Sequence, residues 1–238
     1  MLTLKARHAP DNGLSFWIAL SLASILGCNT GDYFAHFFGH VSGLPVLLVA
    51  FALVLFAEQR DDGGSKAFYW GAILLVRTAA TNLADFFAHG FGLVPALAVL
   101  AALLLLVMLV ARRVRGAAPV AAGLPSVDGM YWITMLLAGT LGTALGDFSS
   151  FRTGLGLGGA SIVLSLLVAV LVGIKTSRSL AVPLSYWLIV VVIRTAGTSV
   201  GDFFAHLIGL WQSTLVFAVL LMAFLWQIPR RGAAVAAN

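Results

Sequence analysis

The chain has 238 residues with a mean hydropathy of +1.02, and only 10% of its residues are charged. Soluble domains carry about 25% charged residues, so the composition excludes an ordinary soluble domain and predicts a polytopic membrane protein. The net charge of +5 and the pI near 9.9 do not indicate nucleic-acid binding, because the basic residues are scattered over short segments between hydrophobic runs.

The apolar runs predict helices that cross the membrane in pairs. Residues 67–111 carry no charge except Arg77 and Asp85, and this stretch is too long for one crossing of about 20 residues. Its only turn signal is the Gly- and Pro-containing segment 90–95. Corresponding turns are expected between Gly39 and Pro45, between Thr153 and Gly156, and around Gly209. We therefore expect one all-α domain, 1–238, with eight transmembrane helices in four two-helix units, at about residues 14–58, 67–112, 129–175 and 183–228.

An aromatic-Trp pair and an acid recur at one fixed spacing. The pairs are Phe16-Trp17, Tyr69-Trp70, Tyr131-Trp132 and Tyr186-Trp187. An Asp follows each Trp by fifteen residues, at Asp32, Asp85, Asp147 and Asp202. Equal spacings of this kind indicate tandem repeats. We expect the four tryptophans to anchor the cytoplasmic ends of their helices at the membrane interface.

Two further positions recur in only some of the units. Four residues after the Asp, the chain has a histidine in three units and a phenylalanine in the third, at His36, His89, Phe151 and His206. Seven residues after the Trp, only the second and fourth units have an arginine, at Arg77 and Arg194. This alternation suggests two successive duplications.

The distribution of basic residues predicts the orientation. With two spans per unit, the first helices of all units run in one direction and the repeats are related by an axis along the membrane normal. The end that holds both termini carries Lys5, Arg7, Arg60, Lys66, Arg112, Arg113, Arg115, Lys175, Arg178, Arg230 and Arg231, whereas the hairpin turns carry only Arg152. The positive-inside rule therefore predicts cytoplasmic termini in a bacterial inner (plasma) membrane, with the Asp and His positions toward the outside.

Helical geometry places the repeated polar residues on one face. At 100° per residue, the Arg, Asp and His positions fall within one stripe roughly 120° wide. Five other polar residues lie on or beside this stripe, namely Asn29, Thr81, Asn82, Thr198 and Ser199. A charge that faces lipid at a helix centre costs about 2.5–3.5 kcal/mol or more. We therefore expect the four stripes to face protein or water and to line a shared polar interior.

This layout resembles a family of uncharacterised bacterial membrane-anchored proteins built of four tandem repeats, each with two transmembrane segments and a characteristic tryptophan. The resemblance runs from Phe16 to about Trp226 and rests on the aromatic-Trp pairs and the repeated Asp. The third unit departs from the pattern, with "GDFSSFRTG" in place of "DFFAH". The resemblance implies a fold layout but no activity.

An Asp and a His four residues apart share a helix face and can offer oxygen and nitrogen to one ion. We expect a transporter or channel for a divalent transition-metal cation, with or without proton coupling, rather than an enzyme. The only cysteine, Cys28, can form no internal disulfide, and we expect it to be a packing residue. The predicted ligands are Asp32, His36, Asp85, His89, Asp147, Asp202 and His206, with Arg77 and Arg194 as internal counter-charges or gates.

Three alternatives stay open. Paired histidines on facing helices could ligate haem, with an arginine at its propionates. The two buried arginines could instead bind the substrate of an anion or organic-solute carrier. The Asp and Arg residues could also serve only to hold the helices in register. The expected partners are the lipid bilayer and a small inorganic ion, and a homo-oligomer is compatible with the sequence.

Overall fold

The computed structural model describes residues 10, 13–61, 65–115, 125–177 and 183–236, and within these residues it contains eight α-helices and no strand. The helices are α1 (Leu14–Phe38), α2 (Leu44–Arg60), α3 (Ala67–Phe91), α4 (Leu93–Arg115), α5 (Gly129–Phe151), α6 (Gly156–Ser177), α7 (Pro183–Ile208) and α8 (Leu210–Ala236). The all-α class and the helix count are confirmed for this part of the chain. Lys5, Arg7 and Arg178, which entered the orientation argument, lie outside the described residues.

Glycines in the left-handed region make the turns between the helices of each pair. Gly39, Gly92 and Gly209 have φ of 76°, 81° and 94°, and the α5–α6 turn contains Gly154 with φ of 79°. Such values favour glycine because a Cβ would clash with the backbone. The structure confirms the turn positions expected from the sequence, since the helices end and restart there.

Five of the described helices are long and apolar enough to cross a membrane, by length and composition: α1, α4, α6, α7 and α8. This indicates a membrane protein. The helix α2 has only 17 residues, which is shorter than the roughly 20 residues of a typical span. Polar residues that face the interior lower the hydropathy of α3 and α5, for example Arg77, Asn82 and Thr143, all of which are buried.

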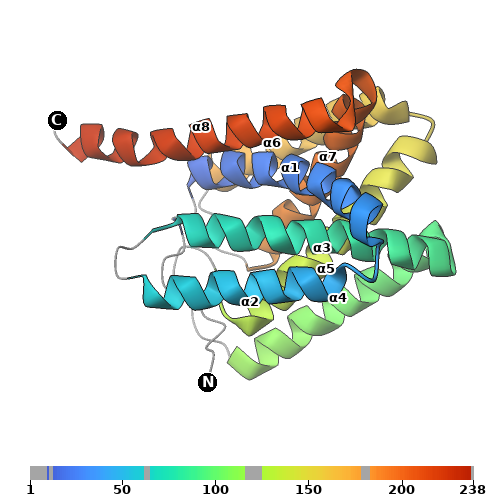
Figure 1. Ribbon diagram of the computed structural model, residues 1–238, viewed down its shortest axis with the longest axis horizontal. Coiled ribbons are helices and arrows are strands. Elements are labelled where there is room, and N and C mark those ends of the chain that lie inside the picture. The colour runs from blue at the N-terminus through green and yellow to red at the C-terminus, as the bar shows by residue number, and fades with distance from the viewer. Residues whose placement is uncertain (1–9, 11–12, 62–64, 116–124, 178–182, 237–238) are drawn as a thin grey trace.

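Four helices form the centre of the bundle, and the other four surround them. The helices α1, α3, α5 and α7, which we call the inner ring, contact each other in that order, and α7 also contacts α1. Each outer helix packs on the inner helix of the following pair: α2 on α3, α4 on α5, α6 on α7, and α8 on α1. Figure 1 shows that α1 begins and α8 ends at the same end of the bundle.

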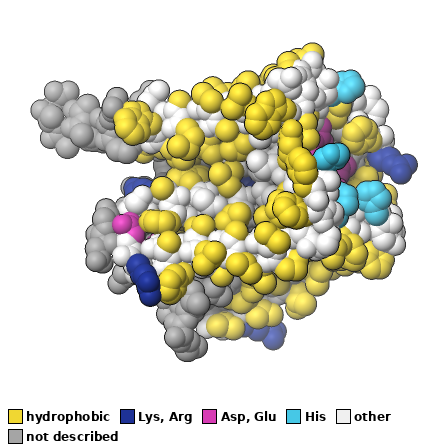
Figure 2. Space-filling model, in the orientation of Figure 1, with side chains coloured by type: hydrophobic (Ala, Val, Ile, Leu, Met, Phe, Trp, Pro, Cys, Tyr) yellow, Lys and Arg dark blue, Asp and Glu magenta, His cyan; other side chains and the backbone are white. Residues whose placement is uncertain are grey.

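The outer helices present an apolar surface. Large side chains such as Leu105, Leu166 and Val219 are exposed there, and most of the surface in Figure 2 is hydrophobic. The inner helices α1 and α7 are mostly buried, whereas α4, α6 and α8 are mostly exposed. An apolar exterior around a polar-lined centre is the arrangement expected in lipid.

The prediction that the tryptophans are interfacial anchors is wrong. Trp17, Trp70, Trp132 and Trp187 are only 1%, 5%, 4% and 7% exposed. Each packs on the aromatic residue of the preceding unit, and the ring centroids are 5.5 Å apart for Trp17 and Tyr186 and 5.8 Å apart for Trp70 and Phe16. A tryptophan at a helix end therefore packs between neighbouring inner helices, because the close helix crossings there offer more apolar contact than the surface does.

Candidate functional site

The end of the inner ring where the helices begin is filled by aromatic rings, and we call it the aromatic end. Phe16, Tyr69, Tyr131 and Tyr186 come from the four inner helices and are at most 2% exposed. The Tyr131 hydroxyl lies 2.6 Å from that of Tyr69 and 3.0 Å from that of Tyr186. The Phe16 ring closes the group, with its centroid 6.4 Å from that of Tyr69 and 6.3 Å from that of Tyr186. These side chains pack into a continuous aromatic layer.

Arg77 lies inside the ring, midway along α3 between Tyr69 of the aromatic end and Asp85. Its guanidinium donates to three threonine hydroxyls at distances of 3.1 Å for Thr81, 2.5 Å for Thr143 and 2.7 Å for Thr198. These threonines belong to α3, α5 and α7, and each lies eleven residues after the Trp of its unit. Cys28 holds the same position on α1. The predicted stripe contained Thr81 and Thr198 but not Thr143 or Cys28, although the same repeat spacing places all four at one level.

Arg77 also donates to backbone carbonyls of α1 and α7. The Nε atom donates to the Ser24 carbonyl at 3.2 Å, and Nη2 lies 3.5 Å from the Arg194 carbonyl. The Arg77 side chain is fully buried. Its partners come from all four inner helices, so Arg77 joins these helices to one another through hydrogen bonds. We call it the polar link of the ring.

Arg194 occupies the equivalent position on α7 but has few partners. It is also fully buried, and its Nη2 lies 3.4 Å from the Met135 sulfur. Within the described part of the chain, its Nε and Nη1 have no hydrogen-bond partner. Its electrostatic neighbours include the tyrosines of the aromatic end. The two arginines predicted to act alike therefore differ, since Arg77 points toward the threonines and Arg194 toward the aromatic layer.

Glycines allow the inner helices to approach closely around these arginines. A Cβ at Gly27 would lie 2.4 Å from Arg77 Cγ, and one at Gly142 would lie 2.4 Å from Arg194 Cβ. One turn further on, a Cβ at Gly31 would lie 2.6 Å from Thr81 Cβ. Non-bonded carbon atoms do not approach this closely, so a side chain at any of these glycines would force the helices apart.

The four repeated acids lie about one helical turn beyond the threonines, at the opposite end of the ring, which we call the acidic end. Asp32 interacts electrostatically with Asp202, Asp85 and Asp147, and Asp147 interacts with Asp202 and Asp85. All four interact with Arg77. The carboxylates therefore share one region of the interior, and the Arg77 guanidinium lies between them and the aromatic end.

Two of these acids form a compact group with the cysteine. Cys28, Asp32 and Asp202 can each offer one ligand atom so that all three atoms lie within 4.8 Å of one another. The Cys28 sulfur lies 3.9 Å from Asp202 Oδ1. Among the described residues, no other group of three His, Cys, Asp or Glu has this geometry. The predicted ligands were Asp and His residues, with Cys28 expected to be a packing residue, whereas this group places the Cys28 thiol beside two of the predicted acids.

Asp85 has a different neighbour. Its Oδ2 lies 3.2 Å from Nδ1 of His40, a residue of the α1–α2 turn. His40 falls outside the repeat spacing, because it lies eight residues after Asp32 rather than four. The turn brings it to Asp85, which no spacing along one helix could have predicted.

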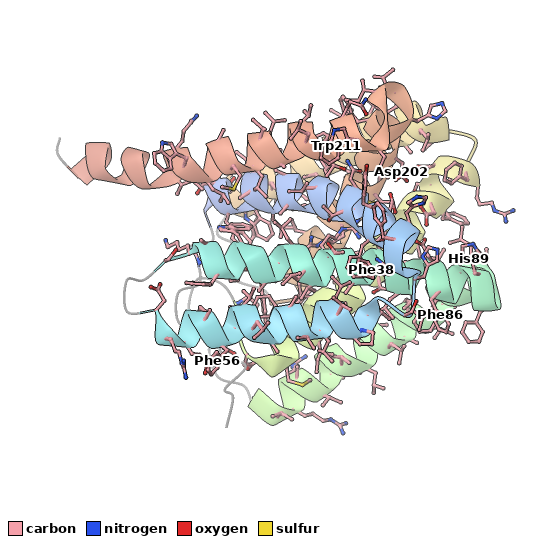
Figure 3. The ribbon with its side chains drawn as sticks, viewed as in Figure 1. Phe38, Phe56, Phe86, His89, Asp202 and Trp211 are labelled. Atoms are coloured by element: carbon pink, nitrogen blue, oxygen red, sulfur yellow. The ribbon has the colours of Figure 1, made fainter. Side chains whose placement is uncertain are left out.

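The three repeated histidines lie at the surface rather than among the carboxylates. His36, His89 and His206 are exposed, and Figure 2 shows the histidines on the outside of the acidic end. Figure 3 shows Asp202 and His89 at this same end. The seven predicted metal ligands thus do not surround one point: the acids converge, and the histidines lie around them.

The other polar residues of the predicted stripe are buried between helices. Asn29 Nδ2 donates to the Ser213 hydroxyl of α8 at 2.7 Å, and Asn82 Nδ2 donates to the Gly31 carbonyl at 3.2 Å. Ser199 accepts a hydrogen bond from the Ser150 hydroxyl at 3.2 Å. These contacts join neighbouring helices, so this part of the stripe faces protein.

These features define an all-α membrane protein with a polar interior. The comparison with protein families found one match: a family described as "Repeat of Unknown Function (DUF347)" matches residues 130–179 and 185–231. The chain is thus similar to an uncharacterised repeat over its third and fourth units, whereas a four-copy family layout, a bacterial source and a family tryptophan stay predictions. Neither the curated proteins nor the solved structures gave a match.

Proposed function

We propose that this protein is a membrane carrier for a divalent transition-metal cation, and that the carboxylates of the acidic end bind the ion. The observation that carries the proposal is the approach of Cys28, Asp32 and Asp202 ligand atoms to within 4.8 Å of one another. A thiolate and two carboxylates suit a borderline ion such as zinc, iron, cobalt, nickel or manganese. Asp85 and Asp147 add negative charge nearby.

A carrier fits the geometry better than an open channel. A cation that moved inward from the carboxylates would next meet the Arg77 guanidinium, which is held by all four inner helices. Beyond it lie Arg194 and then the aromatic layer, whose members are at most 2% exposed at Phe16, Tyr69, Tyr131 and Tyr186. Release to the other side would therefore require the inner helices to rearrange, as in alternating access.

The proposal includes eight membrane spans in four parallel two-helix repeats. Its support is the cyclic order of contacts in the inner ring, together with the placement of each outer helix on the next inner helix. Equivalent positions of the repeats also make equivalent contacts, since Gly27 faces Arg77 and Gly142 faces Arg194. The charge distribution supports an inner membrane location with both termini in the cytoplasm, which would place the acidic end outside.

Metal binding by purified protein variants tests the proposal. We expect Cys28, Asp32 and Asp202 of the untagged protein to bind about one equivalent of Zn²⁺ or Co²⁺. A variant with both Asp32→Asn and Asp202→Asn should lose this equivalent. Because a thiolate gives cobalt an intense near-ultraviolet charge-transfer band, Cys28→Ser should remove that band. The matched control is Asp147→Asn, an acid at the same repeat position outside the compact group. A cobalt–thiolate band that persists at full intensity in the double variant would contradict the proposal, because only the compact group contains a thiol among the described candidate ligands.

One observation favours a second candidate, an anion or organic-solute carrier. Arg194 is fully buried, and its Nε and Nη1 lack partners within the described residues. A buried guanidinium is costly unless its donors are satisfied, so a small anion would be stabilised there. Uptake of labelled anions and cations into proteoliposomes separates the two candidates, because Arg194→Gln should abolish anion uptake and leave Zn²⁺ binding at the acidic end intact.

A further inference from the structure

The outer surface of the acidic end holds a cluster of metal-binding side chains that is separate from the compact group. His40 comes from the turn between α1 and α2, while Asp85 and His89 lie one helical turn apart near the end of α3. His40 Nδ1 is 3.2 Å from Asp85 Oδ2, and the His40 and His89 ring centroids are 5.9 Å apart. We propose that His40 and His89, supported by Asp85, form a second binding site for a divalent transition metal.

Hydrogen bonds fix the orientation of both imidazoles. His89 Nδ1 lies 2.7 Å from the Asp85 backbone carbonyl. A carbonyl can only accept, so Nδ1 carries the proton and donates it, which leaves the Nε2 lone pair free for a metal. Asp85 Oδ2 accepts from His40 Nδ1 in the same way and leaves His40 Nε2 free. A histidine held by a carboxylate or carbonyl through its other nitrogen is the usual arrangement around a bound metal.

The spacing of the rings fits a shared ion. Two imidazoles that bind one metal with bonds of about 2.1 Å have ring centres roughly 5–6 Å apart. The 5.9 Å between the His40 and His89 centroids lies in this range. Both side chains are exposed, so an ion can reach their Nε2 atoms from the solvent.

The ligand set indicates the class of ion. Imidazole nitrogens favour zinc, copper, nickel and cobalt over magnesium and calcium, which prefer oxygen. With two protein nitrogens, the remaining positions of the ion would hold water, so we expect exchangeable binding rather than a structural metal. Asp85 also interacts electrostatically with Asp32 and Asp147. If the surface site captures ions for the inner carboxylates, that role rests on the proposed function. Metal binding by His40 and His89 themselves does not depend on it.

Electron paramagnetic resonance of Cu²⁺ added to the untagged, purified full-length protein tests this site. We expect nitrogen couplings from two imidazoles, with a loss of one coupling and at least a tenfold weaker affinity in His40→Ala and in His89→Ala. Asp85→Asn should weaken binding while both couplings remain. His36→Ala and His206→Ala are matched controls, because these residues are also exposed and share the repeat position of His89.

Two results would overturn the site. The first is unchanged binding in both His40→Ala and His89→Ala, and the second is an equal loss in the His36→Ala control, which would indicate unspecific surface binding. The variant with both Asp32→Asn and Asp202→Asn separates this site from the proposed function. The surface signal should persist in it even when the inner site is lost. Size-exclusion profiles identical to that of the unmodified protein confirm that the exposed-residue variants are folded.

Discussion

Replacing the two buried arginines by methionine should have opposite effects on stability. Arg77 donates to threonine hydroxyls of α3, α5 and α7 and to backbone carbonyls of α1 and α7. Arg77→Met removes a buried cation that interacts electrostatically with all four carboxylates of the acidic end. Breaking a buried charged network in this way costs about 3–5 kcal/mol. At about 2–4 °C per kcal/mol for a chain of this size, the melting temperature should fall by roughly 6–20 °C.

Arg194→Met removes a cation that has almost no compensation. Its guanidinium has one contact at 3.4 Å to the Met135 sulfur, and two of its nitrogens have no partner within the described residues. Replacing poorly satisfied buried charges by apolar side chains of similar size is often neutral or stabilising by about 1–4 kcal/mol. We therefore expect the melting temperature of this variant to stay the same or to rise.

The buried thiol of Cys28 provides the assay. It is the only cysteine of the chain and is 1% exposed, so a dye that fluoresces on reaction with thiols reports unfolding in detergent micelles. Each variant is compared with the unmodified protein at the same detergent and salt concentration. Equal melting temperatures for Arg77→Met and Arg194→Met, or a larger loss for Arg194→Met, would refute the assignment of Arg77 as the polar link of the ring.

Three further predictions concern single contacts. Gly31→Ala should destabilise the protein, because the new Cβ would lie 2.6 Å from Thr81 Cβ. Gly173→Ala on the outer helix α6 meets nothing within 4 Å and should be neutral or stabilising by about 0.5–1 kcal/mol. Thermal melts of the two variants test this difference. Tyr131→Phe removes the hydroxyl that contacts the two other tyrosines of the aromatic layer and should cost about 1–3 kcal/mol in chemical or thermal unfolding. If the compact group binds metal, Zn²⁺ should slow alkylation of Cys28 in the folded protein, and an unchanged alkylation rate at saturating Zn²⁺ would contradict that.

The sequence predicted the parts of the fold that depend on local chemistry. Apolar runs and turn glycines gave the eight helices and their boundaries, because glycine at positive φ and runs without charge act through the chain itself. The environment of the tryptophans was predicted wrongly, since burial at a helix crossing depends on neighbours from other units. Hydropathy cannot distinguish an apolar ring against lipid from one against protein.

The candidate site was only partly accessible from the sequence for the same reason. The repeat spacing identified the four acids, and helical geometry placed them on the inner face. It could not show that Cys28 joins Asp32 and Asp202, or that His40 reaches Asp85, because these contacts depend on the crossing of α1 with α7 and on the path of a turn. The difference between Arg77 and Arg194 likewise depends on rotamers set by the surrounding helices.

The packing of α8 on α1 has a consequence for biogenesis. Because α8 covers α1 and is made later in the chain, one flank of α1 stays without this neighbour until α8 has been synthesised. Halves of the protein made by cutting between α4 and α5 would each lack a cover for one inner helix, and neither half should be stable alone in the bilayer. Linking the end of α8 to the start of α1 and opening the chain at another connection would, in contrast, preserve every helix contact described above, so a circularly permuted chain should insert and assemble.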